Sequence, residues 1–395
     1  MELSVVLSLV MFAVFMALIL TGYNVAFSFV ATALAFSFIG DLTGTFNPNT
    51  LNVLPGRWQN ALEDQTLLAV PLFVLMGAVL ERSGLAERLL NAIGMLMGPL
   101  RGGVAAAVVI VGTMLAAATG VVAATVIVMG LLSLPAMVKL GYDNKLSTGV
   151  IVASGTLAQL LPPSLVLILL AQQLGVGILG LFAGALIPGL IMSGLYVAYA
   201  LGISYLRPHL GPAMPKEQRT LPGKVGSLTA VKISLLMSLM LGLVLLIMSP
   251  RLAAIAVPVL FVVLLGFMMV GGMLTTEVLV SIVPILALIV GVLFSIFQGI
   301  ATPSESGAVG VLGALMLAVL NWYVDKLLVR DGATHVSVEW RLTPKALKHA
   351  GTSTLSIVVL VMTLLFSSTF FSHMFFQLGG SDQTSEWLTA VGGGK

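Results

Sequence analysis

Two short runs of small, hydroxyl and proline residues interrupt long apolar stretches, and residues of this kind can bind an ion or an anionic solute. The first run, ATGVVAAT at 118–125, places Thr119, Gly120 and Thr125 at the midpoint of an apolar stretch. A helix that breaks there exposes backbone carbonyls and amides to an ion or an anionic substrate. Close packing of helices through small residues is the alternative interpretation.

The second run, ASGTLAQLLPPS at 153–164, contains two consecutive prolines. Pro162 and Pro163 remove two backbone donors and exclude the preceding residue from helical geometry, so we expect a discontinuous helix at membrane depth. The freed carbonyls are costly there unless something binds them. The alternative is a simple proline kink, in which the hydroxyl groups of Ser154, Thr156 or Ser164 satisfy these carbonyls.

Two such breaks in neighbouring spans predict a substrate and coupling-ion site near the bilayer midplane, and Na⁺ suits carbonyl and hydroxyl oxygens. A third candidate is Glu305, in GIATPSESG at 299–307. An unpaired acidic side chain in so apolar a context is costly in lipid, which makes it a functional candidate. The alternative is that Thr302 caps a helix beginning at Pro303, with Glu305 in its first turn.

The composition indicates which elements hold these candidates. Of 395 residues, 58% are hydrophobic and 8% are charged, with a mean hydropathy of +1.12, whereas soluble domains carry about 25% charged residues. The fold class is therefore an all-α polytopic membrane protein. The chain has no cysteine, which excludes disulfides and thiolate chemistry, and its net charge of +3 lies in loops, which argues against nucleic acid. Neither H-E-x-x-H nor G-x-S-x-G occurs, so we do not expect an enzyme.

Apolar runs predict about 11 to 12 spans, each near the roughly 20 residues that cross a bilayer. They lie at 4–21, 23–40, 65–80, 103–138, 146–172, 178–205, 233–249, 252–273, 279–297, 306–324 and 351–372. The first, which lacks a basic leader and a cleavage site, is expected to be retained. The stretch 103–138 would make a helix about 54 Å long, so it must form two limbs whose ends lie on one side.

The distribution of basic residues predicts the orientation. With 103–138 folded as two limbs, 15 of the 18 Lys and Arg residues fall in loops on one face, which should be cytoplasmic. These loops are 81–102, 139–145, 206–232 and 325–350. The opposite face receives the N-terminus and the loop at 41–64, so the N-terminus should be periplasmic. Residues 340–350 have the spacing of a helix lying in the membrane interface, with a solvated loop as the alternative.

Several stretches together resemble a known family. They are VPLFVLMGAVLERSGLAERLL (70–90), GPLRGG (98–103), TGVVAATVIVMGLLSLPAM (119–137), GYD (141–143), SGTLAQLLPPS (154–164), FAGALIPGL (182–190) and GIATPSESGAVG (299–310). In this order they resemble the large membrane subunit of tripartite ATP-independent periplasmic (TRAP) transporters. The run TGVVAAT, in place of a serine-rich version, is most similar to the branch associated with mannitol and chloroaromatic-type acids.

The resemblance implies an elevator-type, Na⁺-driven importer of a small organic acid in a bacterial inner membrane. Its implied partners are a periplasmic substrate-binding protein and a small four-helix membrane subunit, and no cofactor other than Na⁺ as coupling ion is expected. The implied substrate and ion contacts are Thr119, Gly120, Thr125, Ser154, Gly155, Thr156, Pro162, Pro163 and Ser164, with Thr302 and Glu305 as further candidates. Na⁺ would lie at Thr119, Gly120, Ser154, Gly155 and Thr156.

The resemblance also implies two inverted repeats, and it predicts how the chain is organised. The predicted parts are N-terminal scaffold spans (1–64), a first repeat with the broken helices (65–205), a basic cytoplasmic linker (206–232), central spans (233–324), and a cytoplasmic loop with the start of a second repeat (325–395). The family's second repeat should hold its own broken helix and Pro-Pro pair, and neither occurs before Lys395.

We therefore expect a fragment, one part of a split subunit, or a degenerate copy without transport activity. The competing functions are an ion-coupled carrier or exchanger that needs no binding protein, and an inactive membrane scaffold.

Overall fold

A computed structural model describes residues 3–216, 227–248, 250–330, 342–381, 384–385 and 389. Within these residues the chain is α-helical and has no strand, which confirms the predicted fold class. Seven of the described helices are long and apolar enough to cross a membrane, or eight if residues 48–82 count as one further span. The chain is therefore a multi-pass helical membrane protein.

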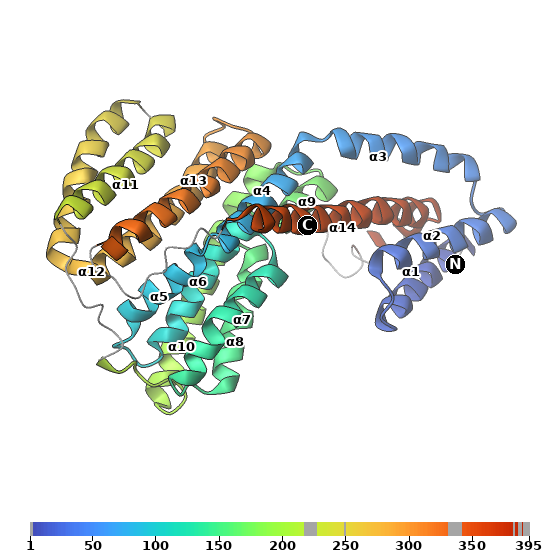
Figure 1. Cartoon of the computed structure of the whole chain (residues 1–395). Helices are drawn as coiled ribbons and strands as arrows, with labels where there is room; N and C mark the ends of the chain where they lie inside the picture. The colour runs from blue at the N-terminus through green and yellow to red at the C-terminus, as the bar shows by residue number, and fades with distance from the viewer. Residues whose placement is uncertain are drawn as a thin grey trace. The chain divides into compact units, whose positions relative to one another are not determined.

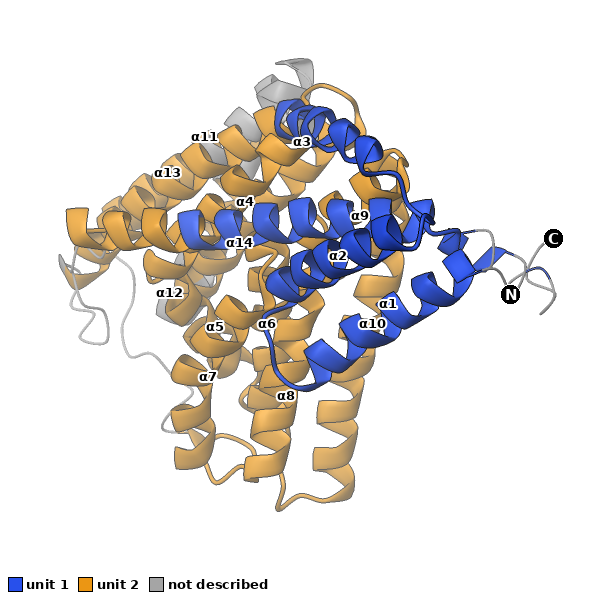
Figure 2. Ribbon diagram, turned by 90° about the vertical axis from the view of Figure 1, so that its right-hand side faces the viewer, with its two compact units in different colours: residues 1–64, 355–395 blue, residues 65–354 orange. Residues whose placement is uncertain are grey.

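The chain divides into two compact units, of which the first comprises residues 1–64 and 355–395 (Figure 2). It contains α1 (Leu3–Leu20), α2 (Val25–Leu42), η1 (Pro48–Val53), α3 (Leu54–Glu63) and the part of α14 (Pro344–Gln377) beyond residue 354. An aromatic cluster forms its core. The ring centroid of Phe15 lies 4.2 Å from that of Phe29 and 4.8 Å from that of Phe371.

The second unit, residues 65–354, holds both predicted breaks (Figure 1). Its helices are α4 (Gln65–Arg82), α5 (Leu85–Met97), α6 (Gly103–Thr119), α7 (Val122–Lys139), α8 (Asn144–Thr156), η2 (Leu157–Gln159), α9 (Leu165–Leu174), α10 (Ile178–Leu206), α11 (Ser227–Met248), α12 (Pro250–Phe297), α13 (Pro303–Arg330) and the first part of α14.

Helix α6 is the centre of the second unit. Nearly all its residues are buried, and it packs against α4, α5, α7, α8 and α10. Its sequence is rich in Ala and Gly, whose small side chains let neighbouring backbones approach closely within a membrane. Glycines also bring α13 onto α4, where Gly307 faces Leu72 and Gly310 faces Met76.

Two segments that we predicted as loops are helical. Residues 81–102 contain α5, in which Leu85, Leu89 and Ile93 are buried at helical spacing. The loop prediction was wrong because charged residues on the other face lower the mean hydropathy of an amphipathic helix. Residues 41–64 contain η1 and α3, and the Asn47 side chain caps η1 by accepting a hydrogen bond from the N–H of Asn49 at 3.0 Å.

The spans predicted at 252–273 and 279–297 are parts of one helix, α12. The polar residues Thr276 and Glu277 do not end it, because both are buried inside the unit. Of the predicted linker 206–232, residues 217–226 lie outside the described part, and α11 already begins at Ser227.

The predicted interfacial segment 340–350 begins outside the described residues, because 340 and 341 are among those not described. From Pro344 onward it is helical and continues as α14. Thr343 precedes this helix, and its hydroxyl accepts a hydrogen bond from the N–H of Ala346 at 3.2 Å.

Candidate functional site

The first predicted break separates α6 from α7 by only two residues. Gly120 ends α6 in the left-handed region, with φ +62°, and donates its N–H to the carbonyl of Ala116 at 2.9 Å. Val121 is extended, and α7 begins at Val122. The over-long apolar stretch thus forms two limbs, as we predicted from its length.

Two threonine hydroxyls join the limbs across this break. The Oγ1 atoms of Thr119 and Thr125 lie 2.8 Å apart, and Thr125 Oγ1 also donates to the carbonyl of Val121 at 3.0 Å. Because a hydroxyl has one proton, Thr119 then donates to Thr125. The oxygen of Thr119 therefore keeps acceptor lone pairs, which could ligate a cation.

The second break, between α8 and α9, contains the Pro-Pro pair. Helix α8 ends at Thr156, η2 adds one tight turn, and α9 starts at Leu165 after the buried Pro162 and Pro163. The Ser164 hydroxyl donates to the carbonyl of Gln159 at 2.9 Å, and the hydroxyls of Ser154 and Thr156 donate to carbonyls within α8. The kink alternative is thus present in part, because the Ser164 hydroxyl satisfies the carbonyl of Gln159, which the missing N–H of Pro163 would leave free.

The structure brings the two breaks together through glycines. A Cβ atom on Gly120 would lie 3.2 Å from both the carbonyl oxygen of Pro163 and the backbone nitrogen of Leu165. A Cβ atom on Gly155 would lie 2.3 Å from the Val126 side chain, at the start of α7. A side chain at either position would therefore press against the other broken segment, most closely at Gly155.

Several carbonyl oxygens remain available where the breaks meet. Within the described part of the chain, those of Ala117, Ala118 and Thr119 accept no hydrogen bond, and neither does that of Pro163. Unpaired carbonyls in a buried site are costly unless an ion or donor binds them. Hydroxyl and carbonyl oxygens of unwound helices are the ligands that transporters use for Na⁺.

The hydrogen bonds of the third candidate are local to the start of α13. Glu305 and Thr302 are exposed, and no described contact joins either of them to the two breaks. The Glu305 carboxylate accepts hydrogen bonds from the N–H of Thr302 at 2.7 Å and from its hydroxyl at 2.9 Å. The Thr302 hydroxyl accepts in return from the N–H of Glu305 at 3.3 Å, which is the capping box of a helix start.

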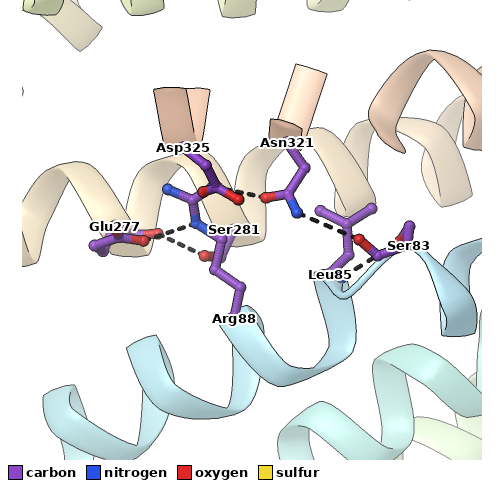
Figure 3. Close-up of polar contacts among 7 residues, drawn as sticks. All are labelled: Ser83, Leu85, Arg88, Glu277, Ser281, Asn321 and Asp325. Carbon is purple, nitrogen blue, oxygen red and sulfur yellow. Dashed lines mark hydrogen bonds and ion pairs between the residues drawn. The ribbon is translucent and has the colours of Figure 1, made fainter. Parts of the chain in front are cut away.

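A buried charge network that was not predicted from the sequence is shown in Figure 3. Arg88 on α5 donates from Nε to Glu277 on α12 at 2.7 Å. Its Nη1 donates to Asp325 at 2.8 Å and to the side-chain oxygen of Asn321 at 2.6 Å, both on α13. Asn321 also donates to the carbonyl of Ser83 at 3.4 Å. This network ties three helices that are far apart in the sequence.

One signal could have revealed this network. Glu277 lies in a long apolar run, where an acidic side chain needs a partner inside the protein. The identity of that partner was not readable, because Arg88 is 189 positions away and we assigned it to a loop.

Comparisons with known proteins agree with the family resemblance. The family model described as the DctM component of tripartite ATP-independent periplasmic transporters matches residues 12–395. The C4-dicarboxylate TRAP transporter large permease protein DctM of Pseudomonas aeruginosa is 32% identical, over 43% of this chain and 40% of that protein.

Two further relatives carry other substrates in their names. The sialic acid TRAP transporter large permease protein SiaM of Vibrio cholerae is 26% identical, over 52% of this chain and 46% of that protein. The isethionate TRAP transporter permease protein DctMQ of Oleidesulfovibrio alaskensis is 28% identical, over 40% of this chain and 25% of that protein. The matched part is thus less than half of each of these three relatives. Because the family model covers nearly the whole chain, the chain belongs to the DctM family, the large permease component of TRAP transporters, which are transport proteins rather than enzymes.

Proposed function

We propose that this chain forms the substrate pathway of a secondary transporter that imports a small organic acid together with Na⁺. The observation that carries the proposal is the contact between two broken helices, at Gly120 and Pro163, surrounded by carbonyls without hydrogen-bond partners. An ion bound there would satisfy those carbonyls. It would also offset the charge of an anionic substrate, which is how Na⁺ binding can couple to substrate binding.

The substrate class rests on the relatives and on the site. The three relatives described above are named for a C4-dicarboxylate, for sialic acid and for isethionate, all of which are small organic anions. By analogy, a periplasmic binding protein delivers the substrate and a small membrane subunit completes the transporter. The chain lies in the inner membrane with its N-terminus in the periplasm.

Uptake by proteoliposomes tests the proposal. Vesicles would hold this chain with its small membrane subunit, and the binding protein would be added outside with labelled C4-dicarboxylate, sialic acid or isethionate. We expect uptake that requires both an inward Na⁺ gradient and the binding protein. Equal uptake with choline in place of Na⁺ would refute the coupling, and equal uptake without the binding protein would favour an independent carrier.

The orientation has a separate test, because the chain has no cysteine and an introduced one is a unique label site. Cysteine at the exposed Asn49 should react with a membrane-impermeant thiol reagent added to intact cells with a permeabilised outer membrane. Cysteine at the exposed Lys145 should react only after the inner membrane is broken. The opposite pattern would invert the proposed topology.

A further inference from the structure

Three loops of the second unit form one structure, which we call the loop platform. It consists of residues 98–103, 140–143 and 207–216, at one end of α6, α7, α8 and α10 (Figure 1). Backbone hydrogen bonds connect these loops. Gly102 donates its N–H to the carbonyl of Gly211 at 2.9 Å, and Asp143 donates its N–H to the carbonyl of Leu210 at 3.0 Å. The loops are therefore held together rather than free in solvent.

The loop platform and the helix ends beside it are positively charged. The basic residues are Arg101, Lys139, Lys145, Arg207 and Lys216, all exposed and none in an ion pair with a described residue. The one acidic residue in these segments is Asp143, whose carboxylate accepts hydrogen bonds from two N–H groups at the start of α8. Burial raises the pKa of Tyr142, so this phenol adds no negative charge. Five basic residues and one acidic residue leave a net charge of +4.

A pocket of about 300 Å³ opens beside the loop platform, between α5 and the limbs α6 and α7. Its wall is mainly apolar, with Leu90, Met95, Val104 and Leu140 among its residues, and Lys139 also lines it. Met214 continues the wall from the loop platform, where its N–H donates to the carbonyl of Gly98 at 2.9 Å. An apolar cavity therefore adjoins basic side chains that form no ion pair with any described residue.

We infer that the loop platform and this pocket bind one anionic phospholipid. The phosphate would lie on Lys139, beside the basic loop platform, and part of an acyl chain would fill the apolar pocket. Basic pockets between membrane helices on the cytoplasmic side suit anionic headgroups in this way, because that leaflet carries negative surface charge. Positive charge alone or an apolar wall alone would not select a phospholipid. At Lys139 the two adjoin, as the headgroup and the acyl chain of a phospholipid do. The inference does not depend on the transport proposal, but it rests on the proposed position of these loops on the cytoplasmic side.

Native mass spectrometry of the full chain in neutral detergent tests the inference. After delipidation, the chain would be titrated with phosphatidylglycerol and, separately, with phosphatidylcholine of the same acyl chains. We expect one phosphatidylglycerol to be retained and phosphatidylcholine to be lost at the same activation energy. Each basic residue near an anionic lipid contributes a factor of about five in affinity, so Lys139→Gln should weaken binding about five-fold.

Two further variants make this result specific. Ala136→Phe, which fills the pocket without changing charge, should also weaken phosphatidylglycerol binding, and Lys139→Arg should preserve it. The control Arg57→Gln removes one exposed positive charge in the first unit, so it should leave binding unchanged.

Three results would overturn the inference. Equal retention of phosphatidylglycerol and phosphatidylcholine would show that the headgroup is not recognised. Phosphatidylglycerol binding that survives both Lys139→Gln and Ala136→Phe would place the lipid elsewhere. Displacement of the lipid by inorganic phosphate at equal concentration would show a simple anion site, because phosphate lacks the chain that the pocket should hold.

Discussion

Gly77→Ala should displace the first break, because Gly77 on α4 lies directly against the end of α6. A Cβ atom at position 77 would lie 2.5 Å from Thr119 Cα and 2.9 Å from Thr119 Cβ. Carbon atoms prefer separations of about 3.5 to 4.0 Å, so the two helices must move apart by about 1 Å. No side-chain rotation can relieve the contact, because the nearest atom belongs to the backbone.

The magnitude follows from two opposing effects. Overpacking of this kind costs about 1 to 3 kcal/mol, whereas replacing Gly by Ala inside a helix gains at most about 1 kcal/mol. We expect a net loss of about 1 to 2 kcal/mol. Gly130→Ala on α7 is the matched control, because nothing lies within 4 Å of its Cβ position. That variant should be neutral or slightly stabilising.

The assay uses the absence of native cysteine. Ala118→Cys introduces a single thiol at a position that is 1% exposed, next to the contact between Gly77 and Thr119. In the Gly77→Ala background the thiol should be alkylated about 5 to 30 times faster, the ratio that corresponds to 1 to 2 kcal/mol. If Gly77→Ala and Gly130→Ala show the same labelling rate and the same melting temperature, the close approach of α4 to the break is refuted.

Three further predictions follow from other contacts. Arg88→Met should lower the free energy of unfolding in detergent by about 3 kcal/mol, because it leaves Glu277 and Asp325 without their shared cation. Adding Glu277→Gln should recover part of this loss, and simple additivity would contradict the network. Pro162→Ala with Pro163→Ala should abolish uptake while membrane insertion stays normal, and normal uptake would refute the second break. Glu305→Gln should affect uptake only mildly if the residue serves as a cap, whereas complete loss of uptake with normal folding would indicate ion or substrate binding.

The broken helices could be predicted because their signals are local. A run of 36 apolar residues is too long for one crossing, and the small residues at its midpoint indicate where it divides. A Pro-Pro pair prevents helical hydrogen bonds wherever it occurs. Both signals depend on backbone geometry rather than on distant partners, so the sequence alone was sufficient to place one break within residues 118–125 and the other at Pro162–Pro163.

The helices α5 and α12 could not be assigned in this way, because their polar residues are accounted for only by tertiary contacts. Glu277 looked like part of a connection between two spans, yet it lies inside α12 because Arg88 neutralises it. Arg88 looked like a loop cation, yet it lies in an amphipathic helix whose other face is buried. Each assignment depended on knowing the other residue, and average hydropathy contains no information about such pairs.

The two breaks form one structural unit, because the residues of each are held in place by the other. Gly120 needs its left-handed conformation to end α6, and it also has to lack a side chain because the backbone of Pro163 and Leu165 lies against it. The prolines in turn hold that segment out of helical geometry, which leaves the carbonyl of Pro163 facing the end of α6. A side chain added at Gly120 and a helix restored at Pro162 and Pro163 would therefore disturb the same set of oxygens. Substitutions in the two breaks should be strongly non-additive, as expected for residues in direct contact.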